Sequence, residues 1–260
     1  MSPVCLITGA SAGIGAALAR EFAKHGHALV LTARREAKLE ALADEIAAEG
    51  HARPLVIAAD LGAAEGTAHL AEALAAARLE PSAVVNNAGF GLLGEAAELD
   101  LARQLAMIDL NARTVTDLSL RWIESIKRHR GAILNVASIT GFMPGPGMAV
   151  YHGTKAYVVS FTEALHQELK SDGIRVCALC PGPVETEFME VAGVPVHYVP
   201  RYLTRTAGRV AQEGYEGLMA GRRVVVPGAA NRIAIFLPRL LPRALMLAIF
   251  ESRWKRVRGG

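Results

Sequence analysis

Tyr151 and Lys155, four residues apart, form the pattern in the sequence with the clearest chemical potential. They open a stretch, Tyr151–Lys170, whose composition predicts a helix, and residues four apart share one helical face. An unperturbed tyrosine has a pKa of about 10, so proton transfer near neutrality requires nearby positive charge that stabilises the phenolate. The spacing predicts a proton-transferring tyrosine assisted by a lysine; taken alone, it equally describes an amphipathic helix surface.

A glycine-rich segment follows the first apolar run of the chain and reads Thr8-Gly9-Ala10-Ser11-Ala12-Gly13-Ile14-Gly15. Glycines allow a tight turn and a close backbone approach to a ligand. The free N–H groups and positive dipole end of the helix that follows attract phosphate. The segment predicts a pyrophosphate site formed by Gly9, Ser11, Ala12, Gly13, Ile14 and Gly15, with a purely structural strand-to-helix turn as the alternative.

Two arginines, Arg34 and Arg35, stand where the second predicted strand ends. In dinucleotide-binding folds an acidic residue at this place holds the ribose hydroxyl, whereas an arginine accommodates a 2′-phosphate. The planar fork of Arg34 matches phosphate oxygens, and we interpret Arg35 as a solvated residue that opens a surface helix. Arg34 therefore favours NADPH over NADH.

Short apolar runs alternate with longer Ala-, Leu- and Glu-rich stretches of helical period, which indicates βαβ units on a parallel sheet. The predicted strands are Val4–Thr8, Ala28–Thr32, Pro54–Ala58, Ala83–Asn86, Ala132–Ala137, Arg175–Leu179 and Arg223–Val226. Helices are predicted from Ile14 to Gly26 and over Arg35–Glu49, Leu99–Arg130 and Tyr151–Lys170. We predict a doubly wound, Rossmann-type α/β fold of about seven parallel strands with helices on both faces, in a single domain spanning 1–260.

Composition narrows the class of protein. Apolar residues make up 52% of the 260 positions, which excludes intrinsic disorder. Lys and Arg total 28 against 25 Asp and Glu, a surplus too small to indicate nucleic-acid binding. The three cysteines lie in apolar runs and the eight histidines lack ligand spacing, so we predict neither disulfides nor a metal site. An apolar run beginning at Val4 leaves no room for a signal peptide, and we expect a reduced, cytoplasmic protein.

Several motifs occur together in one order: Thr8-Gly9-x3-Gly13-x-Gly15, Asn86-Asn87-Ala88-Gly89, Ser138, Tyr151-x3-Lys155 and Pro181-Gly182-Pro183-Val184-Glu185-Thr186. In this combination the chain resembles the short-chain dehydrogenase/reductase family from about Val4 to Gly228, and within it is similar to the bacterial DltE-like reductases. The resemblance implies an NADP(H)-dependent oxidoreductase that interconverts a carbonyl and a secondary alcohol by hydride transfer. A 3-oxoacyl thioester or hydroxysteroid reductase of the same family, or a non-catalytic NADP(H)-binding sensor, is the alternative.

The same resemblance implies a role for each matching residue. Tyr151 would be the general acid/base, Ser138 would hydrogen-bond the substrate oxygen, and Lys155 would bind the nicotinamide ribose and lower the phenol pKa. Asn111 would order a proton-relay water, with an ordinary mid-helix polar residue as the alternative. Further cofactor contacts would come from Asp60, Leu61, Asn87, Ala88, Gly89, Pro181, Gly182, Val184 and Thr186.

Residues 183–205 would form the substrate lid. Its apolar members are Phe188, Met189, Val191, Val194, Val196 and Tyr198. They indicate a lipophilic or bulky carbonyl substrate, or else serve only to fold the lid onto the body. His152, next to the tyrosine, either tunes the site or caps the helix.

The C-terminal arm, residues 231–260, combines apolar residues with interspersed arginines. Prolines and arginines at 238–239 and 242–243 interrupt it, so it does not predict a membrane span. It suits a membrane-surface helix or, as we favour, an arm packed on a neighbouring subunit. We expect a homodimer or homotetramer, for which an apolar stripe is available in Leu101, Leu105, Ile108, Val115, Leu118 and Trp122.

Overall fold

The computed structural model describes residues 1–195, 200–236 and 241–258, apart from the side chains of 253 and 255–258. Its centre is a seven-stranded parallel sheet in the order β3-β2-β1-β4-β5-β6-β7. The strands are β1 (Ser2–Thr8), β2 (Leu29–Ala33), β3 (Leu55–Ala58), β4 (Leu79–Asn86), β5 (Ala132–Val136), β6 (Arg175–Leu179) and β7 (Val224–Val225). The strand order reverses between β1 and β4, which is where doubly wound sheets bind ligands. The predicted single-domain Rossmann fold is confirmed.

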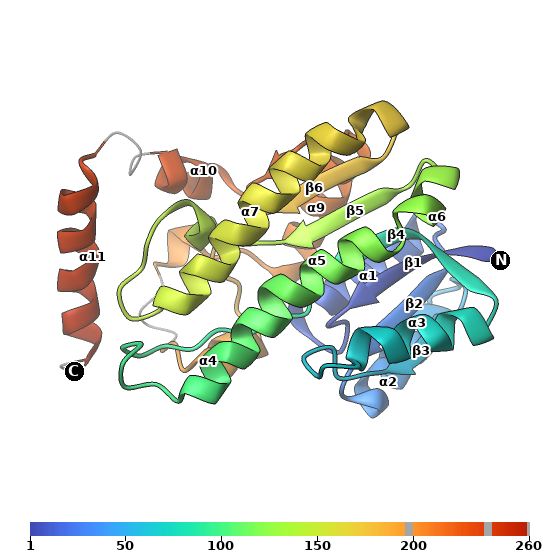
Figure 1. Cartoon of the computed structure of the whole chain (residues 1–260), viewed down its shortest axis with the longest axis horizontal. Coiled ribbons are helices and arrows are strands. Elements are labelled where there is room, and N and C mark those ends of the chain that lie inside the picture. The colour runs from blue at the N-terminus through green and yellow to red at the C-terminus, as the bar shows by residue number, and fades with distance from the viewer. Residues whose placement is uncertain (196–199, 237–240, 259–260) are drawn as a thin grey trace.

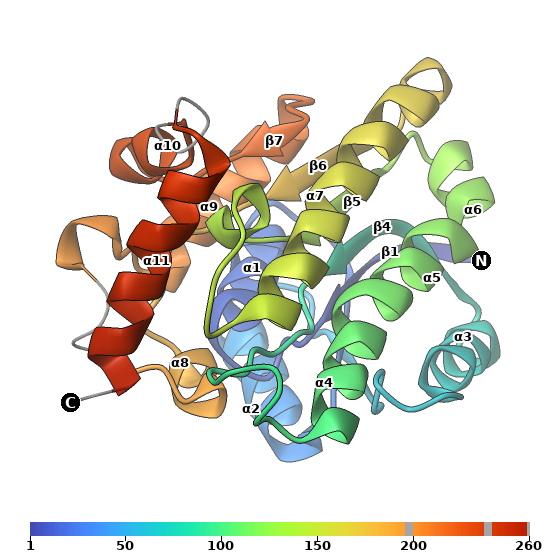
Figure 2. The same ribbon diagram turned by 60° about the vertical axis from the view of Figure 1, so that its left-hand side comes forward.

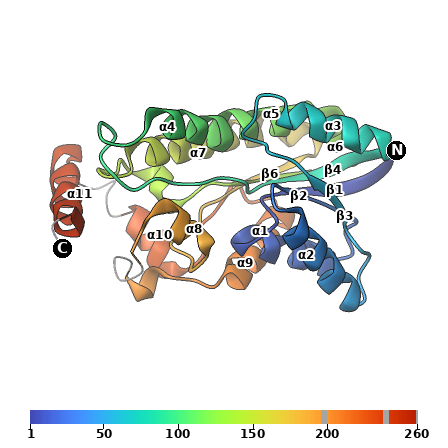
Figure 3. The same cartoon turned by 90° about the horizontal axis from the view of Figure 1, so that it is seen from below.

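Two layers of helices cover the sheet, one on each face (Figure 1; Figure 3). One layer contains α1 (Gly13–Lys24), α2 (Glu36–Ala48) and α9 (Ala207–Met219). The opposite layer contains α3 (Gly66–Ala76), α4 (Leu101–Ile108), α5 (Thr114–Arg121), α6 (Ile123–Arg128) and α7 (Ala149–Leu169). Gly26 and Gly50, predicted to stop the first two helices, adopt φ values of +79° and +86° just beyond α1 and α2.

Alternation along each strand places the two largest of the four apolar clusters formed by the described residues on opposite faces of the sheet, one under each helix layer. In β1, Cys5 and Ile7 pack with Phe22 of α1, whereas Leu6 packs on the other face with Leu118 of α5. All five side chains are buried. The other two cysteines are also buried, and all three are free thiols that pack in the apolar core.

The single helix predicted over Leu99–Arg130 is wrong, because the chain forms three α-helices and one π-helical turn there. Asp100 caps α4 by accepting the Arg103 amide at 2.8 Å. A π-helical turn, 109–113, separates α4 from α5, and Trp122, with φ −115° and ψ 20°, separates α5 from α6. Apolar residues recur through both breaks, so periodicity could not reveal them. The π turn carries Asn111, whose side chain is committed to tertiary hydrogen bonds described below.

The predicted lid contains α8 (Glu187–Ala192) and a 3-10 turn (Arg201–Leu203), and Val184 pairs with Arg205 across its base. The C-terminal arm contains α10 (Ala229–Phe236) and α11 (Arg243–Arg258), and α11 stands at one end of the molecule (Figure 1; Figure 2). Within the described ranges, no helix has the length and apolar character that a membrane crossing requires.

Candidate active site

A cavity of about 590 Å³ opens at the carboxyl ends of β1, β4, β5 and β6. Almost all of the predicted site residues line it: Gly9, Ser11, Ala12, Gly13, Ile14, Arg34, Asp60, Leu61, Asn87, Ala88, Gly89, Ser138, Tyr151, Lys155, Pro181, Gly182, Val184 and Thr186. Gly15 and Asn111 lie behind the wall rather than in it. Motifs far apart in the sequence therefore meet in one place, as parallel strands require.

The glycine-rich turn brings bare backbone to the cavity. Gly9 and Gly13 have φ values of +64° and +57°, which favour glycine, and a Cβ on Gly13 would lie 3.1 Å from Thr186. A Cβ on Gly15 would lie 2.3 Å from the Gly9 carbonyl oxygen, so Gly15 supports the turn from behind. The turn runs into the N-terminus of α1, which carries no acidic residue in its first turn. This cradle of backbone N–H groups fits the pyrophosphate of a dinucleotide.

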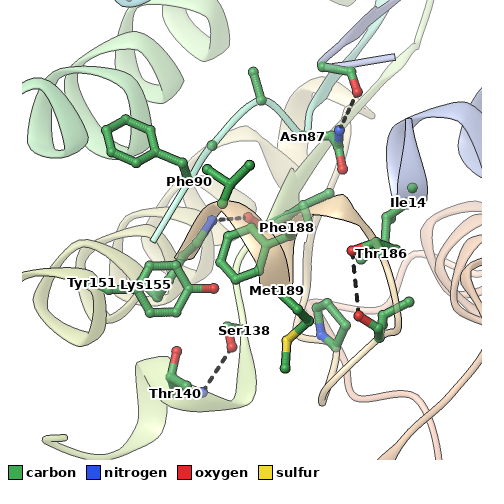
Figure 4. Close-up of a pocket in the computed structure, with 18 of the residues that line it drawn as sticks. Ile14, Asn87, Phe90, Ser138, Thr140, Tyr151, Lys155, Thr186, Phe188 and Met189 are labelled. Carbon is green, nitrogen blue, oxygen red and sulfur yellow. Dashed lines mark hydrogen bonds between the residues drawn. The ribbon is translucent and has the colours of Figure 1, made fainter. Parts of the chain in front are cut away.

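The Asn87 segment is tied to the glycine-rich turn by four hydrogen bonds. The Thr8 hydroxyl oxygen accepts from the Asn87 and Ala88 amides, both at 3.0 Å. The Asn87 side chain donates to the carbonyl oxygens of Thr8 at 3.0 Å and Gly9 at 3.1 Å (Figure 4). The ends of β1 and β4 are thereby fixed beside one another at the switch point.

Tyr151 lies in the first turn of α7 and is buried. Figure 4 shows its phenol oxygen pointing toward the Ser138 hydroxyl, which accepts the Thr140 amide at 3.1 Å. Burial raises the pKa of Tyr151 to about 12, and the side chains of Ser138 and Thr140 oppose part of that rise. In the chain alone the phenol is therefore a proton donor that ionises with difficulty.

Lys155, one turn further along α7, is also buried. Its Nζ donates to the Val136 carbonyl oxygen at 2.8 Å and lies 5.9 Å from the centroid of the Tyr151 ring. Burial lowers the pKa of Lys155 to about 8. The predicted lowering of the phenol pKa is not found in the chain alone, because desolvation acts against the charged form of both groups.

Asn111 is fully buried in the π turn. Its Nδ2 donates to the Phe90 carbonyl oxygen at 2.8 Å and to the Thr154 hydroxyl at 3.2 Å, and its Oδ1 accepts the Phe90 amide at 3.1 Å. Both N–H bonds are therefore used, and one lone pair of Oδ1 remains. Asn111 clamps the backbone that follows Gly89, and its relay role stays a prediction.

The two arginines after β2 differ in their partners. Arg34 is exposed on the cavity wall, and the described residues offer its guanidinium no hydrogen-bond or ion-pair partner. Arg35 also lines the cavity, where Nη2 donates to the Ser11 hydroxyl at 3.1 Å and pairs with Glu187 at 2.7 Å. Arg35 is exposed at the start of α2, as predicted, and in addition it contacts the glycine-rich loop and the lid.

The opposite end of the cavity is apolar. Lid residues contribute Phe188, Met189, Val191 and Val194, and the body contributes Phe90 and Met148. The ring of Phe188 lies 5.5 Å from that of Tyr151, centroid to centroid. Val196 and Tyr198, also predicted for the lid, lie outside the described residues.

His152 lines the cavity, and its ring packs against the backbone of the 143–145 loop. Its Nδ1 lies 2.7 Å from the Met143 carbonyl oxygen, and a Cβ on Gly145 would lie 2.2 Å from its Nε2. Burial lowers the pKa of His152, which favours the neutral ring. The side chain therefore fastens the 143–145 loop to α7, an arrangement different from a helix cap.

Comparison with known proteins places this geometry in a family. The short chain dehydrogenase family matches residues 3–193. The chain belongs to the short-chain dehydrogenases. Sulfoacetaldehyde reductase 2 of Chromohalobacter salexigens is 37% identical over 191 residues, 72% of this chain and 75% of that protein.

Two solved structures extend the likeness to nearly the whole chain. One, a short-chain dehydrogenase from Sphingobium yanoikuyae in complex with NADPH, matches with a TM-score of 0.80 and 32% identity over 94% of this chain and 95% of that one. The other is the bulky-bulky ketone specific alcohol dehydrogenase from Comamonas testosteroni, with a TM-score of 0.76 and 28% identity over 95% and 94% of the two chains. As a short-chain dehydrogenase, this protein is an NAD(P)-dependent oxidoreductase of alcohol and carbonyl groups.

The cavity residues of this short-chain dehydrogenase that were not predicted include Arg35, Glu187 and Phe250. Arg35 adjoins a predicted residue, so its neighbourhood was a usable signal. Glu187 and Phe250 carry no motif, and Phe250 reaches the cavity from α11, far along the chain. Such contacts depend on how the lid and arm return to the sheet, which local sequence does not specify.

Proposed function

We propose that this protein is an NADP(H)-dependent carbonyl reductase or alcohol dehydrogenase for a bulky, apolar substrate. The observation that carries the proposal is one cavity with a polar corner of Ser138, Tyr151 and Lys155, an unpartnered arginine near the glycine-rich turn, and an apolar end under the lid. The bound cofactor would supply or accept the hydride at its nicotinamide ring. The protein's own side chains would supply the proton, position the substrate and hold the cofactor.

Tyr151 gives its phenolic proton to the substrate oxygen during reduction and takes it back during oxidation. Ser138 donates a hydrogen bond to that oxygen and keeps it within reach of the phenol. Lys155 holds the cofactor ribose and, when protonated, stabilises the phenolate. Asn111 fixes the Gly89–Phe90 backbone and offers its free Oδ1 lone pair to a relay water.

Arg34 supports the preference for NADP(H). Among the described residues its guanidinium has no partner on the wall of the cavity beyond the glycine-rich turn, where it can bind a 2′-phosphate in a forked geometry. The resemblance to a short-chain dehydrogenase solved with NADPH agrees with this assignment. The DltE-like subgroup remains part of the proposal.

The apolar end of the cavity supports a bulky ketone. Phe90, Met148, Phe188 and Met189 give it large flexible or aromatic walls, which suit hydrophobic burial of a substrate with few polar groups. The similarity to a ketone-specific alcohol dehydrogenase points in the same direction. Reduction of a 3-oxoacyl thioester, or of a ketosteroid to a hydroxysteroid, is the second candidate, since either substrate has an apolar body of comparable bulk.

A homo-oligomer in the cytoplasm completes the proposal. Of the predicted apolar stripe, Val115 and Leu118 are buried in the core, whereas Leu101, Leu105 and Ile108 are exposed along α4. Those three side chains form an apolar edge that a second copy would cover.

The first test is calorimetric titration with NADPH and NADH, because it does not depend on guessing the substrate. We expect tighter binding of NADPH, with the preference lost in Arg34→Ala and kept in Arg103→Ala, which removes another exposed arginine. Preference for NADH would overturn the cofactor assignment.

The second test follows NADPH oxidation with reactive diketones and aldehydes. Tyr151→Phe should lose turnover while binding NADPH normally, because only the phenolic hydroxyl is removed. Wild-type turnover in Tyr151→Phe would refute the proposed mechanism, and cofactor binding without turnover on any carbonyl would favour a sensor.

A further inference from the structure

Glu187, the first residue of the lid helix α8, forms ion pairs with two cations, Arg35 at the N-cap of α2 and Lys38 in its first turn. Each oxygen of Glu187 holds one of them: Oε2 lies 2.7 Å from Nη2 of Arg35, and Oε1 lies 2.6 Å from Nζ of Lys38. These cations hold the pKa of Glu187 down to about 2. Glu187 therefore remains an anion throughout the physiological pH range.

This carboxylate lies at the end of the cavity assigned to the cofactor's phosphate. Ser11, Arg34, Arg35 and Glu187 all line that cavity, and Nη2 of Arg35 is shared between Glu187 and the Ser11 hydroxyl. A phosphate bound at Arg34 and Arg35 would contact Arg35 while the Glu187 carboxylate is already paired with it. Two anions that share one guanidinium repel each other and compete for its N–H groups.

We propose that Glu187 competes with the 2′-phosphate of NADP(H) for Arg35, and so limits how strongly the protein prefers NADP(H) to NAD(H). This inference rests on the proposed function, because it concerns the same cofactor site. NAD(H) carries a hydroxyl in place of that phosphate, so Glu187 scarcely affects its binding. The residue is thus a determinant of cofactor selectivity contributed by the substrate lid.

The opposite role, in which Glu187 orients Arg35 for the phosphate, is less consistent with the contacts. Arg35 has a second anchor in Ser11, which keeps the guanidinium at the glycine-rich turn without Glu187. The side chains of Arg35, Lys38 and Glu187 are 47%, 49% and 43% exposed, so an ion pair there orders its partners only weakly. Removal of the negative charge should therefore dominate over any loss of order.

The experiment measures NADPH and NADH affinities of the full chain by calorimetry at about 20 mM salt, where surface charges are little screened. Glu187→Gln removes the charge and keeps the shape of the side chain. Glu190→Gln is the matched control, because Glu190 is an exposed carboxylate of the same helix that lies outside the cavity wall. Thermal unfolding of all three proteins checks that they are folded.

We expect Glu187→Gln to bind NADPH about three- to tenfold more tightly than wild type, and NADH within about twofold. Glu190→Gln should change neither affinity beyond about twofold. The gain for NADPH should shrink at about 0.5 M salt, as an electrostatic effect does and a purely structural role does not.

An unchanged or weaker NADPH affinity in Glu187→Gln overturns the inference. Equal gains for NADPH and NADH also overturn it, since competition with the 2′-phosphate affects one cofactor alone. The proposed function fails separately, when the wild-type chain binds NADH more tightly than NADPH. Even then, the NADPH affinity of Glu187→Gln still decides whether the carboxylate competes with phosphate.

Discussion

Replacing Lys155 with methionine should stabilise the ligand-free protein while removing its activity. The lysine is buried, and burial lowers its pKa from 10.5 to about 8. The folded state therefore disfavours the ammonium form that the unfolded chain carries at neutral pH. Methionine fills a similar volume without a charge, so the substitution removes this penalty.

The size of the effect follows from the pKa shift. A change from 10.5 to about 8 corresponds to about 3 kcal/mol at neutral pH, at about 1.4 kcal/mol per pKa unit. The hydrogen bond from Nζ to the Val136 carbonyl oxygen is lost, which costs about 1 kcal/mol. The expected net stabilisation of Lys155→Met is about 2 kcal/mol at pH 7.

The sign of the pH dependence is fixed by linkage. A lysine whose folded pKa lies below its unfolded value destabilises the protein fully below pH 8, and the penalty disappears as the pH rises to 10.5. The advantage of Lys155→Met over wild type should therefore shrink across that range. The thiols of the unfolded chain also titrate in this range, whereas burial raises the pKa of each cysteine above it in the folded protein; this contribution is common to both proteins and cancels in the difference.

Urea unfolding of the ligand-free proteins between pH 7 and 10 measures this difference. Lys170→Met, at an exposed position just after α7, is the matched control and should change stability by less than about 0.5 kcal/mol. A Lys155→Met protein that is less stable than wild type at pH 7, or a difference that does not vary with pH, would refute the reasoning.

Three further substitutions test parts of the fold that support the site. Gly9→Ala should cost about 1–2 kcal/mol and abolish cofactor binding in calorimetry, because φ is +64° and the new Cβ would lie 2.8 Å from the Ala88 Cα. Asp100→Ala should lower the free energy of unfolding by about 1 kcal/mol in urea, since the Arg103 amide loses its cap. Asn135→Leu should cost about 3 kcal/mol or more in the same assay, because buried donors on α5 and β4 lose the Oδ1 they share.

The sheet could be predicted from the sequence because its strands are continuous apolar runs separated by helical periods. The single predicted helix before β5 failed because periodicity reports an apolar face and cannot register a π turn. That turn follows from the buried hydrogen bonds of Asn111 to the Phe90 backbone, a tertiary interaction between residues 21 apart. The local sequence is therefore enough to predict which segments are helices and strands. It is not enough to predict the π turn, which depends on a tertiary contact.

The residues of the site likewise divide into those that the sequence predicts and those that depend on tertiary contacts. The glycine-rich turn, Ser138, Tyr151 and Lys155 follow strand ends or open a helix, so their meeting at the sheet edge follows from the fold class. Arg35 and Glu187 are joined by an ion pair between α2 and α8, which depends on the return path of the lid. No local pattern in the sequence encodes that path.

The state of the tyrosine is where sequence and structure differ most instructively. The Tyr-x3-Lys spacing places a lysine beside a phenol, and proximity alone would lower the phenol pKa. Burial reverses the expectation, because the same enclosure raises the pKa of Tyr151 to about 12 and lowers that of Lys155 to about 8. The charged form of each group is therefore less favourable than in water, although a lysine with a pKa of about 8 still carries its proton for the most part at pH 7. The proton exchange proposed for Tyr151 near pH 7 would then require positive charge that arrives with a ligand, and we expect its acid–base activity to depend on ligand binding.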